Sequence, residues 1–409
     1  MIVVCLGHEW DSWLRRSNRI LLGLCENGLA EHVIFFERPL TFRNIYEYLT
    51  GRANHTVNER CRRLLRHGFM SRVNGRITVA TAVIPAVFFR SRALQAVNEA
   101  LRTVQHLLLL RSCRALKKSK DERVLLWLQR PEFNSRYIRR VAHWKVLYDC
   151  TEDYIELLKG EAPALWEKYK EDDTAITEKA DLITTVSKEY AGIKARSNPN
   201  THWVSNGVDY QAFVKAAGEN GGREERHNGN PVLAFIGILN HRHDLDLVLT
   251  LARRYPGATM ELVGPANSYV ASKVAEEGIQ NIRFIPGIAA GDIPRYLRWV
   301  DVCLSPLKHD YLNRTGSSMK IYQYLASGLP IVAYPVSDAE YFGDVIYLAE
   351  DRNKYVELVG VAMNEPPDDP RAALRKEYAR ENDWAVKVEK FRGLVLEIDR
   401  GDSVNPGFR

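Results

Sequence analysis

Short runs of β-branched and other apolar residues alternate with longer amphipathic segments along most of the chain. In the first half, the short runs predict strands at residues 2–6, 32–36, 124–128, 145–148, 182–186 and 201–204. Runs of four to six such residues bounded by polar or turn residues are typical of buried strands. Strands that alternate with helices in this way predict a parallel sheet flanked by helices.

The pattern stops at residues 215–230, which are rich in Gly, Asn and charge and therefore predict a linker. It then restarts, with strands predicted at 232–236, 259–263, 282–285, 302–304 and 331–334, and helices at 245–254, 293–299 and 320–326. The sequence thus predicts an α/β protein with two doubly wound, Rossmann-like domains, at residues 1–214 and 231–379. Residues 370–400 have helical spacing with an apolar face, and we expect residues 380–409 to return to the first domain and complete it.

Length and composition agree with two soluble domains, because 409 residues exceed what one ordinary core holds. The chain begins directly with an apolar run, which predicts a first strand rather than a signal peptide. No run approaches the roughly 18 apolar residues that a membrane-spanning helix needs. The six cysteines form no C-x-x-C pair, so we expect a reducing, cytoplasmic location without disulfides.

Charge is distributed unevenly along the chain. Residues 52–120 contain fifteen Lys and Arg residues, opposed only by Glu59 and Glu99. The same region contains the apolar stretch 83–89 and four consecutive leucines at 107–110. Basic residues beside apolar ones predict a surface that lies on an anionic membrane, at the inner face of the cell membrane. The alternative is a solvated basic face over an ordinary core helix, and no module for nucleic acid accompanies the charge.

One segment, residues 316–324, combines small polar residues, a cation and an amide at the start of a predicted helix. The N-terminus of a helix offers unpaired N–H groups and a partial positive charge, which suit a phosphate group. Lys320 adds a full charge, and Gln323 lies on the same helical face, where its amide can bind sugar hydroxyls. Spacing alone is equally compatible with an ordinary amphipathic helix that ends at Gly328.

Together these motifs resemble the GT-B glycosyltransferases. The tract Val204-Ser205-Asn206-Gly207-Val208-Asp209, with Phe213 four residues on, is similar to the segment that closes the first domain in many sugar-nucleotide-dependent enzymes. The unit from Phe235 to Leu247 and the tract 281–287 resemble the first unit and the base-binding loop of the second domain. The resemblance implies two domains that face an interdomain cleft, with a nucleotide diphosphate sugar as substrate and uridine as the favoured nucleotide.

The commonest retaining members of this class have two glutamates around the last helix, but Thr315 and Gln323 occupy those positions here. The segment resembles instead the corresponding helix of the xanthan-type inverting glucuronosyltransferase. This resemblance implies that Lys320 contacts the diphosphate and Gln323 the ribose. It also implies backbone and hydroxyl contacts from Ser317, Ser318 and Met319.

Four further residues are donor-binding candidates. Gly237 directly follows the first strand of the second domain, and Arg242 lies shortly after it, where the donor phosphates pass in the resembling enzymes. Their base-binding strand and loop correspond to Ile285 and Gly287. The alternative for Arg242 and its histidine neighbours is a solvated loop.

An inverting transfer needs a base that deprotonates the acceptor hydroxyl. An acidic cluster follows the strand predicted at 145–148, where a loop at the carboxyl end of a strand faces the ligand crevice. The resembling family has its base in this loop, nearest Glu152, while Asp153 and Asp149 stay open. A helix cap is the structural alternative in this cluster, and His8, after the first strand, is a rival base.

Three residues are candidates for the acceptor side: Trp10 for stacking on a sugar, and Arg16 and Arg130 for contacts with an anionic acceptor. Arg16 is equally compatible with an ordinary helix surface. No D-x-D tract lies at a strand end in the manner of a bound divalent ion, so we expect neither a metal nor a cofactor.

The sequence therefore predicts an inverting, metal-independent glycosyltransferase that acts on a lipid-linked or polysaccharide acceptor. The first alternative keeps the fold and changes the reaction, to a retaining transferase or a sugar-nucleotide epimerase. The second is a non-catalytic subunit that binds a membrane or a partner. A nicotinamide dehydrogenase is disfavoured, because no G-x-G-x-x-G follows Leu6.

Overall fold

The computed structural model describes residues 1–10, 15–85, 92–114, 123–131, 134–159, 163–218 and 229–400. The chain divides into two units, which we describe separately. The first contains Met1–Val204 and Val388–Arg409, and the second contains Ser205–Lys387.

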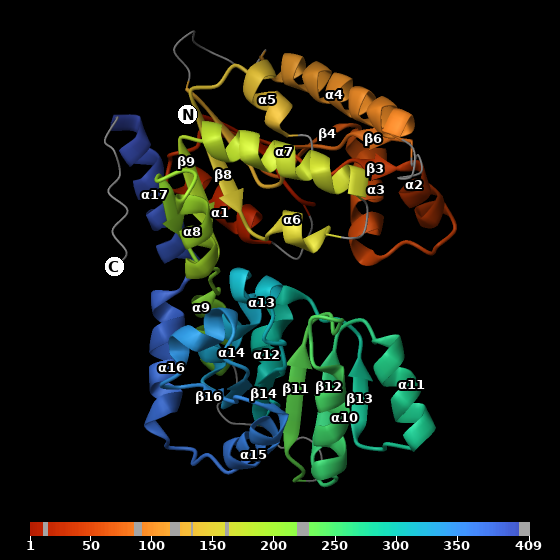
Figure 1. Cartoon of the computed structure of the whole chain (residues 1–409), viewed down its shortest axis with the longest axis vertical. Coiled ribbons are helices and arrows are strands. Elements are labelled where there is room, and N and C mark those ends of the chain that lie inside the picture. Colours follow the sequence, from red (N-terminus) through yellow and green to blue (C-terminus); the bar gives the residue numbers. More distant parts are fainter. Residues whose placement is uncertain are drawn as a thin grey trace. The chain divides into compact units, whose positions relative to one another are not determined.

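The described part of the first unit is built on an eight-stranded sheet in the order β10-β9-β8-β7-β1-β2-β5-β4. Figure 1 labels β4, β8 and β9 of this sheet. Its strands are β1 (Ile2–Leu6), β2 (His32–Phe36), β4 (Met70–Arg72), β5 (Ile77–Ala80), β7 (Val124–Leu128), β8 (Lys145–Cys150), β9 (Leu182–Thr185) and β10 (Thr201–Trp203). All neighbours are parallel except β4, which runs antiparallel to β5. The sheet order reverses between β1 and β7, and in such sheets the crevice at this point binds ligands.

A separate pair, β3 (Leu40–Thr41) and β6 (Val83–Ile84), accompanies this sheet. The helices of the first unit are α1 (Arg16–Glu26), α2 (Phe42–Leu49), α3 (His55–His67), α4 (Arg92–Arg114), α5 (Ser135–Arg140), α6 (Tyr154–Leu157), α7 (Pro163–Lys179), α8 (Lys188–Ala195) and most of α17 (Trp384–Arg400).

The C-terminal helix α17 packs into the first unit through two close contacts. A Cβ added to Gly23 on α1 would lie 2.4 Å from Val388, so only glycine admits α17 at this distance. The ring of Phe391 stacks on Trp127 of β7, with 5.4 Å between the ring centres. Burial of large aromatic rings dominates core energetics, so these contacts hold the end of the chain on the first sheet.

The described part of the second unit has a six-stranded, fully parallel sheet in the order β13-β12-β11-β14-β15-β16. Its strands are β11 (Val232–Ile236), β12 (Thr259–Val263), β13 (Ile282–Ile285), β14 (Val302–Ser305), β15 (Ile331–Ala333) and β16 (Tyr347–Leu348). Its helices are α9 (Tyr210–Gly218), α10 (Leu245–Arg254), α11 (Ser268–Glu277), α12 (Ile293–Leu297), α13 (Tyr311–Thr315), α14 (Met319–Ser327), α15 (Arg352–Met363) and α16 (Pro370–Glu381). The order reverses between β11 and β14, which confirms the predicted doubly wound sheet.

Several bounds differ from the prediction by one or more residues, and three of the differences concern the domain organisation. Residues 215–218 were assigned to a linker but continue helix α9, and residues 219–228 lie outside the described residues. The division between the units falls at Val204 and again inside α17, rather than at residues 214 and 380. The helical stretch 370–400 is two helices, because Asn382 and Asp383 interrupt it. Asp383 accepts a hydrogen bond from the backbone N–H of Tyr210 (2.9 Å), so the break also anchors α9.

None of the described helices combines the length and the apolar composition needed to cross a membrane.

Candidate functional site

The second unit brings Gly237 and Lys320 into contact at the point where the sheet order reverses. Gly237 follows β11 with a φ of 130°, a conformation that favours glycine. A Cβ added there would lie 2.2 Å from Cε of Lys320 and 2.7 Å from its Nζ. The Lys320 ammonium also lies 5.2 Å from the centre of the Phe235 ring. Both predicted donor residues therefore lie at the expected ligand crevice of this sheet.

The surroundings of Lys320 make its proton easier to remove. Burial, with the nearby guanidinium of Arg242 as the second cause, lowers the pKa of Lys320 to about 8. A buried cation without a neutralising anion is unfavourable, so an anion placed beside it would be bound with corresponding strength.

The start of helix α14 already has a carboxylate bound to it. The backbone N–H of Ser318 donates to Oδ2 of Asp338 (2.6 Å), and the Tyr322 hydroxyl donates to Oδ1 (2.7 Å). Burial raises the pKa of Asp338, while these donors lower it. The Ser318 N–H is therefore already paired, which corrects the expectation that it is available for a phosphate.

Ser317 and Arg242, two of the predicted donor-binding residues, form hydrogen bonds with other residues of the second unit. Ser317 Oγ accepts from the Asn206 amide (3.0 Å). The Arg242 guanidinium donates to Oδ1 of Asn313 (2.9 Å) and to the carbonyl of Leu312 (3.0 Å), so it is anchored to α13. Arg242 thus contributes positive charge near Lys320 from a fixed position, rather than from a solvated loop.

The remaining donor candidates line the same sheet or helix. Ile285 ends β13 and its carbonyl accepts from the N–H of Gly264, while Gly287 is exposed two residues further on. Met319 is exposed at the first turn of α14. Gln323 is partly buried on the same helix, and no hydrogen bond from its amide to another described residue is present.

His243, one of the histidine neighbours of Arg242 that the sequence analysis considered with the donor phosphates, is buried near Lys320 rather than in a solvated loop. Its ring packs edge-on against Phe235, with 5.1 Å between the ring centres. Burial, with the positive charge of Lys320 as the next cause, lowers the pKa of His243 to about 3, so the imidazole is neutral at pH 7. Its place after Gly237 made it a candidate in the sequence, but only the fold shows its burial and its neighbours.

In the first unit, the loops after β1 and β7 meet around His8. Its Nε2 forms a hydrogen bond with the Tyr154 hydroxyl (2.8 Å), and its backbone N–H donates to Oε1 of Gln129 (3.2 Å). The Arg130 guanidinium lies over the Tyr154 ring, 4.7 Å from its centre. Burial, assisted by Arg130, lowers the pKa of His8 to about 3. A group with so low a pKa is a weak base, so the structure does not favour His8 in that role.

The acidic cluster after β8 separates into three environments. Asp149 is fully buried, 3.5 Å from the Arg16 guanidinium, and accepts from the Thr184 hydroxyl (2.8 Å). Asp153 caps the short helix α6 by accepting from the N–H groups of Ile155 and Glu156. Glu152 is partly exposed. The structure therefore assigns a stabilising role to Asp149, and a capping role to Asp153.

Two acceptor candidates are corrected in the same way. Arg16 is buried, and its guanidinium lies between Asp149 and the Phe391 ring, so it belongs to the core of the first unit. Trp10 is also buried, edge-on against Phe35, rather than presented for stacking on a sugar. Arg130 keeps its position at the end of β7.

Within the described ranges, no group of three or more His, Cys, Asp or Glu side chains is arranged to hold a metal ion. Metal independence stays a prediction.

Comparison with known structures identifies the fold. Sucrose-phosphate synthase from Thermosynechococcus elongatus superimposes with a TM-score of 0.70 at 13% identity, covering 98% of this chain and 100% of that chain. A UDP-forming trehalose-phosphate synthase from Burkholderia vietnamiensis gives 0.68 at 13% identity, with 98% of each chain covered. Anabaena HepE in complex with UDP and glucose gives 0.60 at 12% identity, covering 97% and 99%. The fold is the GT-B fold of glycosyltransferases, as the sequence predicted.

The matches found by sequence cover less of the chain than the structural matches do. Residues 230–362, most of the second unit, match the family model described as "Glycosyl transferases group 1". The chain is also 24% identical over 292 residues to the "Putative teichuronic acid biosynthesis glycosyltransferase TuaH" of Bacillus subtilis, covering 67% of this chain and 72% of that protein. The particular resemblance to the xanthan-type glucuronosyltransferase stays a prediction.

Proposed function

We propose that this protein is a glycosyltransferase of polysaccharide biosynthesis that transfers a hexosyl or glycuronosyl group from a nucleotide diphosphate sugar, with UDP favoured. The acceptor is a lipid-linked or polysaccharide glycan. The fold, the group 1 match over the second unit and the similarity to TuaH support this proposal. The observation that carries it is Lys320 packed on Gly237 at the point of strand-order reversal.

In this proposal Lys320 stabilises the leaving diphosphate. As the bond between the sugar and the diphosphate breaks, negative charge grows on the leaving oxygen, and a fixed cation there lowers the barrier. Arg242 adds positive charge near Lys320 without itself being displaced, since α13 holds its guanidinium. No metal ion is needed for this step.

Glu152 is the proposed base. It would remove the proton from the acceptor hydroxyl as that oxygen attacks the anomeric carbon, with inversion of configuration. Its two rivals in the same loop are occupied, Asp149 by the buried pair with Arg16 and Asp153 by the cap of α6.

UDP affinity is expected to fall as the pH rises above about 8. The diphosphate raises the pKa of Lys320 from its value of about 8 in the free protein. Below that pH the lysine is already protonated and its contribution is complete. Above it, binding must take up a proton, so affinity falls by up to about tenfold per pH unit. Calorimetry from pH 7.5 to 9.5 in buffers of different ionisation enthalpy measures both effects; constant affinity with no proton uptake would contradict the role of Lys320.

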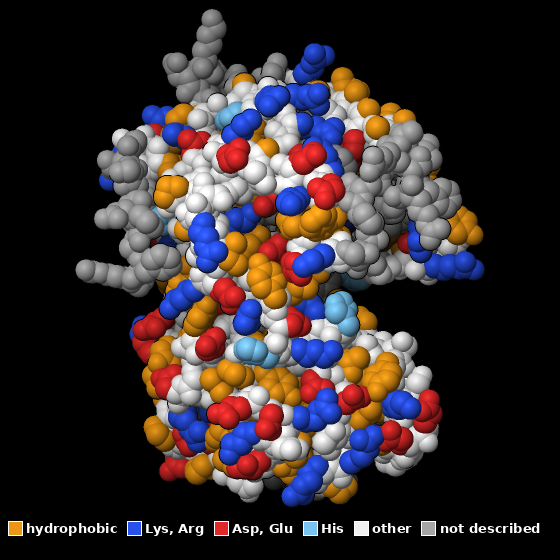
Figure 2. Space-filling model, viewed as in Figure 1, with side chains coloured by type: hydrophobic (Ala, Val, Ile, Leu, Met, Phe, Trp, Pro, Cys, Tyr) orange, Lys and Arg blue, Asp and Glu red, His pale blue; other side chains and the backbone are white. Residues whose placement is uncertain are grey.

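We also propose that the first unit lies on an anionic membrane surface through the region 52–120, at the cytoplasmic face. Arg60 and Arg63 of this region pair instead with the buried Glu37, and residues 86–91 and 115–120 lie outside the described residues. Large apolar side chains are nevertheless exposed at helical spacing on α4 of this region, namely Val97, Leu101, Val104 and Leu108, and on α2, which precedes it in the chain, namely Phe42, Tyr46 and Leu49. Figure 2 shows hydrophobic and basic side chains together over α4. Exposed apolar rows beside basic side chains suit an anionic bilayer.

Leu49→Ser and Leu108→Ser are each expected to lower binding to vesicles that contain phosphatidylglycerol, by up to about tenfold per buried leucine. Added salt should weaken binding of the unchanged protein, because it screens the charges. Vesicle sedimentation measures both. Val361→Ser, which changes an exposed apolar side chain on α15 of the second unit, is the control. Equal partitioning at low and high salt would remove the electrostatic part of the proposal.

A thermal-shift panel of sugar nucleotides, followed by a turnover assay on the best binder, tests the function itself. Proton NMR of the product reads its anomeric configuration and so separates inversion from the retaining alternative. Release of free nucleotide without an acceptor would favour an epimerase or hydrolase. Failure of every nucleotide diphosphate to stabilise the protein would favour a non-catalytic subunit.

A further inference from the structure

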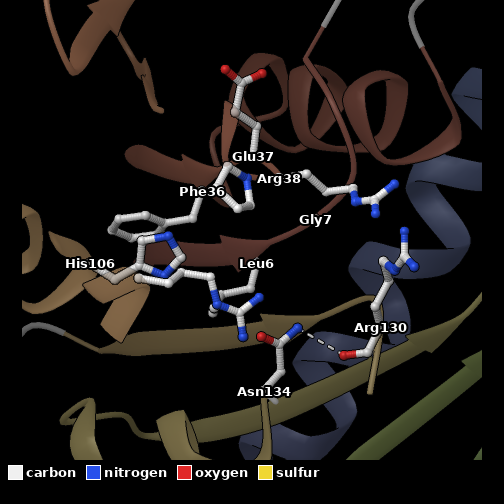
Figure 3. Close-up of a pocket in the computed structure, with 10 residues that line it drawn as sticks. Leu6, Gly7, Phe36, Glu37, Arg38, His106, Arg130 and Asn134 are labelled. Carbon is white, nitrogen blue, oxygen red and sulfur yellow. Dashed lines mark hydrogen bonds between the residues drawn. The ribbon is translucent and has the colours of Figure 1, made fainter. Parts of the chain in front are cut away.

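A small pocket opens in the first unit at the carboxyl ends of β1, β2 and β7 (Figure 3). It is lined by Leu6, Gly7, Phe36, Glu37, Arg38, Pro39, Arg102, His106, Arg130 and Asn134. Its empty volume is about 290 Å³, part of which is open solvent. The pocket is therefore small, and it suits one charged group rather than a whole glycan.

The lining carries an excess of positive charge. Arg38, Arg102 and Arg130 face a single lining carboxylate, Glu37. The Glu37 carboxylate is already paired with Arg60 (3.0 Å) and Arg63 (2.7 Å), which lie outside the lining. It also accepts a hydrogen bond from the backbone N–H of Trp10 (3.1 Å). Arg38 pairs with Glu9 (3.6 Å), and Arg102 pairs with Glu99 (2.8 Å), which Arg136 also approaches at 3.6 Å. The arginines around the pocket outnumber these three glutamates, and positive charge gathered at one concave site favours an anion there.

His106 supplies a second, independent sign of a ligand. It is only 3% exposed, and its Nδ1 lies 2.7 Å from the Tyr137 hydroxyl. Its Nε2 is buried and has no hydrogen-bond partner among the described residues. The tautomer that accepts the Tyr137 proton at Nδ1 carries its own proton on Nε2 and can donate it. Buried polar atoms are rarely left unpaired, so this one calls for an acceptor atom in the pocket.

Backbone geometry keeps the pocket open and joins it to the acceptor side. A Cβ added to Gly7 would lie 2.5 Å from the Phe35 ring and 2.6 Å from Oε1 of Gln129, so glycine is required there. Asn134 donates to the Arg130 carbonyl (2.8 Å) and holds that strand end in place, as the dashed line in Figure 3 shows. The Arg130 guanidinium also covers Tyr154, the partner of His8. In Figure 3, Arg38 and Arg130 lie on one side of the pocket and His106 on the other.

We propose that this pocket binds an oxyanion of the acceptor, a phosphate or a carboxylate, through Arg38, Arg130 and His106. The assignment to the acceptor rests on the proposed function; the oxyanion site itself does not. The planar guanidinium of arginine can donate to two oxygens of either group at once, and a neutral imidazole N–H adds one directed donor.

Calorimetry in the Lys320→Ala background tests the proposal, because that change removes the lysine proposed to bind the donor diphosphate. Inorganic pyrophosphate and glucuronate are the probes. Arg38→Gln and His106→Gln should each weaken the better probe by about tenfold, the effect of losing one charge-assisted or buried hydrogen bond. Arg62→Gln, an exposed arginine of α3 outside the lining, should leave binding unchanged.

The stronger probe identifies the source of the oxyanion. The Arg38 side chain is 44% exposed, so its replacement keeps the fold, and a thermal melt checks the His106 variant. Absence of binding by both probes at millimolar concentration would overturn the proposal, as would equal weakening by Arg62→Gln. If the unchanged protein does not bind UDP, the proposed function is contradicted. The calorimetry with pyrophosphate and glucuronate still tests the oxyanion site in that case.

Discussion

Replacing Lys320 with alanine is expected to weaken UDP binding by about tenfold to a hundredfold. A hydrogen bond to a charged group contributes roughly 1.5–3 kcal/mol, and 1.4 kcal/mol corresponds to tenfold in affinity. Lys320 lies against Gly237 at the end of β11, where its ammonium is partly buried and its pKa is lowered. Calorimetry with UDP and with uridine gives the comparison, since uridine lacks the diphosphate and should lose little.

The matched control is Lys354→Ala, because Lys354 is an exposed lysine on α15 that pairs only with Glu357 among the interactions described for it. It should change neither ligand's affinity. Equal losses for UDP and uridine in the Lys320 variant would mean that the lysine supports the whole site rather than the diphosphate.

Replacing Glu152 with glutamine is expected to lower turnover by about 10²- to 10⁴-fold, the usual contribution of a positioned acid or base. The amide keeps the size of the side chain and loses only its ability to accept a proton. Donor affinity should stay nearly constant, because Glu152 belongs to the first unit and the donor residues to the second. Steady-state rates with calorimetric UDP affinity separate the two quantities.

Glu156→Gln is the control for this prediction, since Glu156 is an acidic neighbour on α6 that pairs with Lys159. It should leave turnover within a small factor of the original. Normal turnover in the Glu152 variant would move the base to Asp153 or His8. Asp149 would then be tested last, because its partner Arg16 makes its removal a change to the core.

The strands that the sequence predicted best are those buried on both faces. The bounds of β1, β7, β11 and β12 agree residue for residue with the predicted runs, because such strands are continuous apolar stretches between polar ends. The two-residue strands β3, β6 and β16 were missed, since two residues have no period. The short antiparallel strand β4 was missed for a similar reason, and the four-residue strand β5 was missed although it is buried throughout.

The candidate site was predicted in part. The segment 316–324 and a glycine after β11 were both visible as local patterns, but only the fold shows that Lys320 rests on Gly237. Likewise, nothing in the spacing of the residues indicated that Asp338 occupies the N–H of Ser318. His106 and Arg38 were not selected either, because the pocket joins loops and a helix that are distant in the sequence.

The acidic cluster after β8 and the basic region 52–120 show most clearly what the sequence alone could not predict. The sequence established which residues follow β8, but not their neighbours, and neighbours decide the role of an ionisable group. Asp149 points inward to Arg16, and Asp153 turns to cap α6. In the same way Arg60 and Arg63, counted as surface charge, neutralise a buried Glu37.

By itself, then, the sequence determined the two doubly wound sheets and the segment around Lys320, because periodicity and helix-terminus chemistry are local. The tertiary structure decided which charges are paired inside and which stay available for ligands. The physical reason is that burial and ion pairing depend on residues brought together from distant parts of the chain, such as Arg16 with Asp149 and Lys320 with Gly237.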